Sequence, residues 1–116
     1  MSFNYARLTE IAQVSDSVGA VYTNPSGVTS YIRTIILHNT NTSTEEVKLY
    51  TVPDNSGSVG TASSANKWYN ESLGAGETRV IEFAAPGIIL LDENDTIQAV
   101  TNTASKVTIQ IYGAIE

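Results

Sequence analysis

Hydrophobic and polar residues alternate along much of this chain, most clearly in residues 106–116. Val107, Ile109 and Ile111 are separated by Thr108 and Gln110, a period of two that indicates a strand with one buried and one exposed face. No segment has the period of a convincing amphipathic helix. The pattern predicts strands at residues 8–14, 18–23, 28–39, 45–52, 67–73, 77–84, 88–91, 96–101 and 106–116.

Turn-forming residues separate these runs at short intervals, as between the strands of a β-sandwich. We therefore expect an all-β protein with a single β-sandwich of about eight or nine short strands. An Ig-like and a jelly-roll-like topology both fit the pattern. We expect residues 1–7 to form a flexible N-terminal arm and residues 8–116 to form the sandwich domain.

Two segments depart from simple alternation. Ile35, Ile36 and Leu37 are consecutive and apolar, which a strand buried on both faces or a bulge that switches faces would explain. Residues 53–66 are dominated by Asp, Asn, Ser and Gly, and they predict a long loop of the kind that is functional or mobile.

Composition limits the classes of partner. The chain has 116 residues, a formal net charge of -6, no cysteine, and six basic residues that form no cluster in the sequence. An acidic chain without a basic stripe argues against binding to nucleic acid. No run of about 18 apolar residues and no secretory signal is visible, so we expect no membrane partner and synthesis in a cytoplasm.

Few residues suggest catalytic or metal chemistry. His38 is the only histidine and lies within an apolar strand, where a hydrogen bond to a neighbour is the expected role. The acidic run 92–95 lacks the spacing of a calcium loop and predicts a turn. Glu45 and Glu46 are adjacent in a strand and therefore point to opposite faces. We predict no enzymatic activity, no catalytic residues, no metal site and no cofactor.

Aromatic residues are the better candidates for binding a partner. Trp68 and Tyr69 are adjacent, so alternation favours one ring in the core and the other on the surface, while an aromatic platform is the other interpretation. Phe3, Tyr5 and Arg7 lie in the predicted arm and could order on contact with a partner.

The chain has turn and strand segments, in this order, at residues 22–27, 32–40, 47–53, 73–78, 87–90, 95–99 and 109–116. This order of segments resembles small virion proteins of tailed bacteriophages. The resemblance covers residues 21–116 and rests on turn and strand patterns, which identify a type of fold more than a role. One departure is Asn24, where a hydrophobic residue is expected before Pro25.

This resemblance implies a structural virion protein with no catalytic residues to carry over. The expected role is a capsid decoration (cement) protein that binds and stabilises the head shell in many copies. The alternative is a tail- or fibre-associated module that binds a host-surface glycan or receptor. The implied partner is the major capsid protein or another virion protein. We also expect a homo-oligomer, with a homotrimer favoured because it matches the local symmetry of a capsid.

Overall fold

The protein is built from ten β-strands in the part of the chain, residues 5–116, that this computed structural model describes. None of the described residues forms a helix that could cross a membrane. The strands are β1 (Ala6–Arg7), β2 (Ala12–Gln13), β3 (Gly19–Thr23), β4 (Ser30–Asn39), β5 (Glu45–Val52), β6 (Lys67–Leu73), β7 (Thr78–Glu82), β8 (Ile88–Leu90), β9 (Thr96–Thr101) and β10 (Val107–Ile115).

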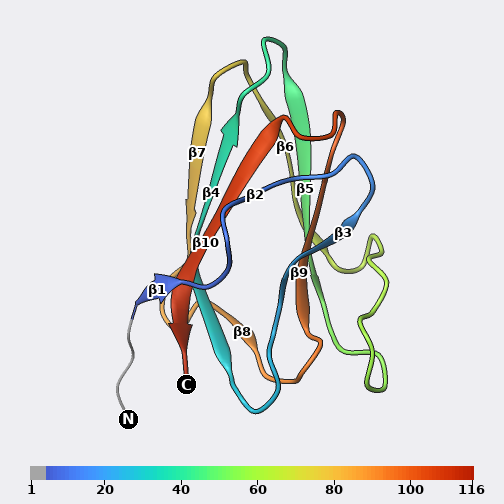
Figure 1. Cartoon of the computed structure of the whole chain (residues 1–116), viewed down its shortest axis with the longest axis vertical. Coiled ribbons are helices and arrows are strands. Elements are labelled where there is room, and N and C mark those ends of the chain that lie inside the picture. Colours follow the sequence, from blue (N-terminus) through green and yellow to red (C-terminus); the bar gives the residue numbers. More distant parts are fainter. Residues whose placement is uncertain (1–4) are drawn as a thin grey trace.

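The strands form two antiparallel sheets packed face to face, which confirms the predicted β-sandwich (Figure 1). The six-stranded sheet has the order β1-β10-β4-β7, with β2 also paired to β10 and β8 also paired to β4. The four-stranded sheet has the order β3-β9-β5-β6.

The pairing between strands is nested along the chain. β1 and β2 pair with β10, β3 pairs with β9, β4 pairs with β7 and β8, and β5 pairs with β6. An Ig-like sandwich instead keeps its early strands together as hairpins within one sheet. The nested order is that of a jelly roll, so the structure distinguishes the two topologies that the sequence left open.

The N-terminal region differs from the prediction. Ala6 and Arg7 were placed in the flexible arm, but they pair with Gly113 and Tyr112 of β10. The strand predicted at residues 8–14 is present only as the two residues of β2. The arm residue Phe3 lies outside the described residues.

A bulge interrupts β4 and explains its irregular sequence pattern. β10 pairs Tyr112 with Thr34 and Gly113 with Ile32, so Arg33 is an extra residue on β4. Ile32 and Ile35 consequently both point into the core although they are three positions apart. A Cβ atom on Gly113 would collide with the carbonyl oxygen of Tyr31, so glycine is required where the two strands approach most closely.

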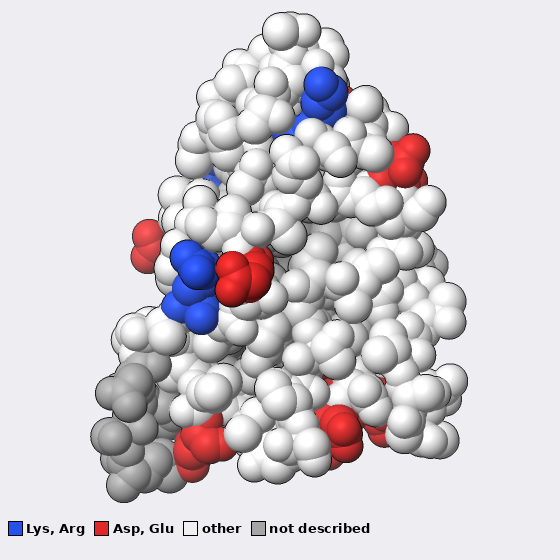
Figure 2. Space-filling model, viewed as in Figure 1, with Lys and Arg blue, Asp and Glu red and all other residues white. Residues whose placement is uncertain are grey.

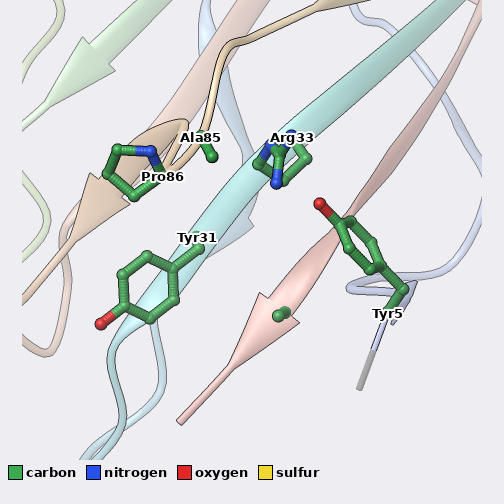
Figure 3. A pocket seen from close by; sticks show the side chains of 6 residues that line it. Tyr5, Tyr31, Arg33, Ala85 and Pro86 are labelled. Carbon is green, nitrogen blue, oxygen red and sulfur yellow. The ribbon is translucent and has the colours of Figure 1, made fainter. Parts of the chain in front are cut away.

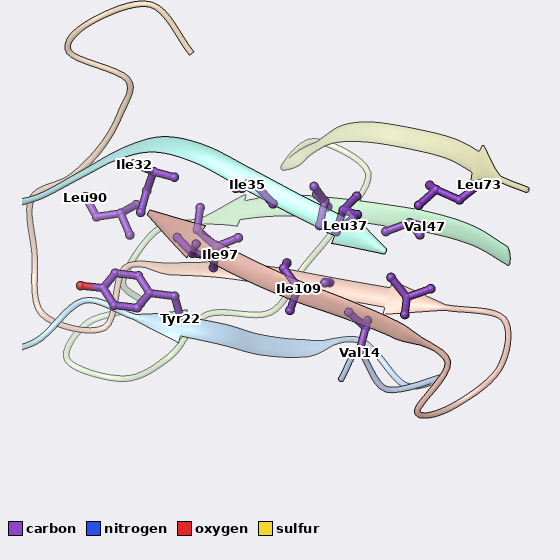
Figure 4. Close-up of a cluster of buried hydrophobic side chains, with 14 residues drawn as sticks. Val14, Tyr22, Ile32, Ile35, Leu37, Val47, Leu73, Leu90, Ile97 and Ile109 are labelled. Carbon is purple, nitrogen blue, oxygen red and sulfur yellow. The ribbon is translucent and has the colours of Figure 1, made fainter. Parts of the chain in front are cut away.

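Inward-facing aliphatic side chains from both sheets fill the space between them (Figure 4). Ile109 and Ile111 are buried and Gln110 is half-exposed, which confirms the predicted orientation of the last strand. Burial of each large aliphatic side chain contributes about 1.5–3 kcal/mol. The largest fully buried apolar side chains are Ile32, Ile35, Leu37, Leu49, Leu73, Leu90, Ile97, Ile109 and Ile111.

Asn24 is buried, and hydrogen bonds explain how a polar residue can occupy this position. Its Nδ2 donates to the carbonyl oxygens of Val28 (2.9 Å) and Asp92 (3.1 Å), and its Oδ1 accepts from the hydroxyl of Ser30. Ser30 also lies 2.7 Å from the hydroxyl of Tyr22. A buried polar side chain with all of these partners is tolerated, so Asn24 connects two turns where a hydrophobic residue was expected.

Candidate functional site

The outer face of the six-stranded sheet is the best candidate for a functional surface. Val80 of β7 and Ile89 of β8 are 51% and 41% exposed, although both lie within strands. Val80 is paired with Ile36 and Ile89 with Tyr31, so apolar and aromatic residues are neighbours across this face. We call this surface the open face.

At one end of the open face lies a largely apolar hollow of about 450 Å³. Tyr31 and Arg33 of β4 contribute to its lining, Ala85 and Pro86 lie on one side, and Tyr5 lies on the other (Figure 3). Ala114 of β10 also lines it. We call this the tyrosine hollow.

The bulge in β4 creates the hollow. β7 pairs with β4 as far as Thr34, and β8 pairs from Ile32 onward, so the chain leaves the sheet edge between Glu82 and Ile88. The Phe83 N–H donates to the Arg33 carbonyl oxygen (2.9 Å), and the Arg33 Nε donates to the Phe83 carbonyl oxygen (3.1 Å). These two bonds fix the detour that carries Ala85 and Pro86.

Arg33 supplies the positive charge of the hollow. Its guanidinium carbon lies 5.6 Å from the ring centroid of Tyr5, a cation–π geometry. Arg7, Lys48 and Arg79 each form an ion pair with a carboxylate. Among residues 5–116, Arg33 forms none, so its charge is not neutralised by a carboxylate of the described chain.

Tyr31 is held in place at the rim of the hollow. Its hydroxyl donates to Glu116 Oε2 at 3.0 Å. That hydrogen bond raises the pKa of Tyr31 above its ordinary value, and burial and the negative charge of Glu116 act in the same direction. The hydroxyl is therefore protonated at neutral pH and already used as a donor.

The structure separates the aromatic residues that the sequence singled out. Tyr5 is 61% exposed and lines the hollow, whereas Arg7 lies beside it in β1 and pairs with Glu10 at 3.9 Å. Trp68 and Tyr69 lie on β6, at the edge of the other sheet.

Trp68 and Tyr69 are both half-buried against the core, so the expected division into one buried and one exposed ring is wrong. A register shift between Leu49 and Tyr50 of the neighbouring strand lets both rings turn inward. Trp68 packs edge-on against Tyr69 (centroids 6.0 Å apart) and Phe83 (5.4 Å). The pair fits a role in packing better than an exposed platform.

The residues with possible catalytic chemistry have structural partners. His38 Nδ1 lies 2.7 Å from the Thr78 hydroxyl on the open face. Asp95 accepts hydrogen bonds from the backbone N–H groups of Asp54, Leu91 and Asp92, as a turn-capping carboxylate does. No group of three potential metal ligands occurs in the described part of the chain.

Glu45 and Glu46 point to opposite faces, as predicted. Glu45 is buried and accepts hydrogen bonds from Asn41 Nδ2 and the Thr103 N–H, both at 2.9 Å, while Glu46 faces outward beside Lys48. Burial alone would raise the pKa of Glu45. The hydrogen bonds from Asn41 and Thr103, with the charge of Lys106, outweigh it and lower the pKa below its usual value.

The long loop, residues 53–66, lies against the outer face of the four-stranded sheet. Gln98 points outward from β9 but is only 4% exposed, and its Nε2 donates to the Gly60 carbonyl oxygen at 3.0 Å. Asn94 Nδ2 donates to the Gly57 carbonyl oxygen at 3.1 Å. The loop therefore covers the part of this sheet around Gln98.

Charged side chains are sparse on the side of the molecule seen in Figure 2, where they occur as small separate groups on a wide uncharged surface. Scans against protein-family models, curated proteins and solved structures found no match to this chain. Function must therefore be argued from the site itself.

The prediction from the sequence did not include Arg33, Tyr31 and Pro86 among the binding residues, and it did not place them in one site. Two signals were present: the break in alternation within β4 and the Pro86-Gly87 turn. Neither signal shows that the bulge and the turn lie side by side, because that depends on the pairing of β4 with β7 and β8.

Proposed function

We propose that this protein is a structural virion component of a tailed bacteriophage, a decoration protein that binds and stabilises the head shell in many copies. The open face is the attachment surface, and the shell protein is the partner. The proposal also includes assembly as a homotrimer on the particle, where three copies match the local symmetry of a shell.

The contrast between the two outer faces carries this proposal. A loop covers part of one sheet, around Gln98, whereas the other sheet exposes Val80, Ile89 and the tyrosine hollow. Exposed apolar residues that cluster on one face are typical of an interaction surface. Jelly rolls are common in viral capsid proteins and in lectins, and the sequence pattern resembles phage virion proteins.

The test is co-sedimentation of the purified protein with phage particles that have been stripped of their own copies. We expect the wild-type protein to sediment with the particles and Val80→Asp to lose most binding, because the change puts a charge into a desolvated contact. Val59→Asp is the matched control, since Val59 is 46% exposed on the loop that covers the other sheet. Equal binding by both variants would remove the open face as the attachment surface.

The same co-sedimentation assay can also test whether the N-terminal segment takes part in attachment. Deleting residues 1–7 removes β1 and Tyr5, and residues 5–7, the described part of this segment, are exposed. We expect the shortened protein to stay folded and to bind the particles more weakly. Binding equal to that of the full chain would mean that the N-terminal segment takes no part in attachment.

The alternative is a tail- or fibre-associated module that binds a host-surface glycan or receptor. With Trp68 and Tyr69 half-buried, the exposed ring of Tyr5 in the hollow is the better candidate for stacking on a sugar. Electron microscopy of virions distinguishes the roles directly, because density for the protein on the tail rather than the head would replace the decoration proposal.

A further inference from the structure

The tyrosine hollow has the dimensions and lining of a binding site for a single anchoring side chain. Its volume of about 450 Å³ lies within the range of small-molecule pockets, about 300–1,000 Å³, and leaves room for one large side chain and part of a neighbouring residue. Ala85, Pro86 and Ala114 supply small apolar walls, and the rings of Tyr5 and Tyr31 flank them. Interfaces commonly insert one large apolar side chain into such a pocket.

The positive charge of Arg33 favours a negatively charged group next to the anchoring side chain. Arg33 has no carboxylate partner among the described residues, and only its Nε is bound, to the Phe83 carbonyl oxygen. The remaining N–H groups of a guanidinium form a planar fork that matches a carboxylate. The cation–π contact with Tyr5 orients that fork without neutralising its charge.

The same features argue against a sugar as the occupant. Recognition of a sugar requires several polar side chains to bind its hydroxyl groups, and the polar side-chain groups of the lining residues are the Arg33 guanidinium and the hydroxyls of Tyr5 and Tyr31. Tyr31 already donates its proton to Glu116. An apolar group with one adjacent negative charge matches the apolar walls and the charge of Arg33.

We propose that the tyrosine hollow receives an aromatic or aliphatic side chain of the shell protein whose neighbour in sequence is acidic, and that Arg33 binds the carboxylate of that neighbour. The inference rests on the proposed function for the identity of the partner. The chemistry of the hollow can be tested without the particle.

The first experiment is an NMR titration of the ¹⁵N-labelled full chain with two matched peptides, acetyl-Ala-Phe-Glu-Ala-amide and acetyl-Ala-Phe-Gln-Ala-amide, at millimolar concentration. We expect the Glu peptide to shift the amide signals of Arg33, Ala85 and Ala114 and to bind about fivefold more tightly than the Gln peptide, as for a hydrogen-bonded charge pair near the surface. This comparison needs no variant, so it does not depend on how a substitution folds.

Two variants then separate the charge from the apolar wall. Arg33→Gln is expected to abolish the preference for the Glu peptide, whereas Lys48→Gln, the same change of charge on the other sheet, should keep it. Tyr5→Ala should weaken both peptides alike and preserve the preference.

Three results would overturn the inference: no binding of the Glu peptide, equal binding of both peptides, or shifts confined to another part of the surface. Binding of a neutral glycan that shifts the same signals, with no response to either peptide, would also overturn it in favour of the sugar. Co-sedimentation separates this failure from failure of the proposed function. If Arg33→Gln binds particles as tightly as the wild-type protein, the role of the hollow is wrong while attachment to the particle stands. If neither the wild-type protein nor any variant binds particles, the proposed function is wrong. The peptide titration then still decides whether the hollow binds an apolar side chain beside a carboxylate.

Discussion

The two sheets have similar inner faces and very different outer faces. In the four-stranded sheet, β9 is buried on both sides around Gln98, because the core covers Ile97 and Ala99 while the long loop covers Gln98. In the six-stranded sheet, β10 has the same kind of inward residues, but Gln110 and Tyr112 on its other side are half-exposed.

This difference shows how one long connection divides the surface of a small sandwich. A single loop of this size covers the part of one sheet around Gln98, whereas Val80 and Ile89 on the other sheet stay exposed. The uncovered sheet keeps exposed apolar residues, which cost free energy of hydration unless a partner buries them. The covered face is thus a stability feature, and the open face is where function should be sought.

The largest expected effect tests whether the inner faces are equivalent. Ile109→Ala in the six-stranded sheet and Ile97→Ala in the four-stranded sheet each remove a fully buried side chain, so each should lower the free energy of unfolding by about 2–5 kcal/mol. Chemical denaturation measures both values. A much smaller loss for either variant would mean that one sheet packs loosely.

The next effect tests the outer faces with one substitution at two positions. Gln98→Ala should cost about 1–3 kcal/mol, because it leaves the Gly60 carbonyl oxygen without its donor beneath the loop. Gln110→Ala on the open face should cost less than about 0.5 kcal/mol. The comparison fails if the two variants have equal melting temperatures.

A smaller effect concerns the loss of stability at acidic pH, and it involves Glu45 in the four-stranded sheet. The folded-state pKa of Glu45 is lowered, so its stabilising contribution is complete above the unfolded-state pKa and is lost as the pH falls through the folded value. Urea unfolding between neutral and acidic pH should show a smaller acid loss for Glu45→Gln than for the wild-type protein. Some loss should remain, because the Gly74 N–H and Arg79 also lower the pKa of Glu77.

Glu46→Gln is the control for this measurement, since Glu46 points outward from the same strand and makes only a half-exposed ion pair with Lys48. The acid loss of Glu45→Gln should be smaller than that of this control. The opposite order of the two variants would show that Glu45 is not the titrating group.

The smallest expected effect is on the open face itself. Val80→Ser should change the free energy of unfolding by less than about 0.5 kcal/mol, because Val80 is exposed in the free protein. Co-sedimentation with stripped particles should nevertheless be weakened. A large loss of stability together with unchanged binding would assign Val80 to the core rather than to an interface.

Local alternation was sufficient to predict most strands of this fold. Residues of β10, β5 and β9 have one face made of Val, Ile, Leu or Ala, and these strands lie where the pattern placed them. β1 and β2 were predicted poorly, because two-residue strands contain too few positions for a period to be read. Their pairing is decided by β10, which is far away in the sequence.

The candidate site was the least predictable part, for the same physical reason. Tyr5 was identified from its aromatic ring, but Arg33 and Pro86 belong to the hollow only because β4 is bulged and β7 and β8 share it as a partner. Trp68 and Tyr69 were misjudged because a register shift overrides alternation. Bulges and register depend on contacts between distant strands, which a single sequence does not display.

The nested strand order also has a consequence for how the chain folds. β10 lies between β1 and β4 in the six-stranded sheet, yet it is the last of the ten strands to leave the ribosome. The six-stranded sheet therefore cannot close during synthesis of the other nine strands, and one edge of β4 lacks its hydrogen-bonding partner until β10 is made. Pairings of such long sequence separation make folding slow and leave apolar strands transiently exposed. The interval before β10 arrives is the time at which neighbouring chains are most prone to aggregate.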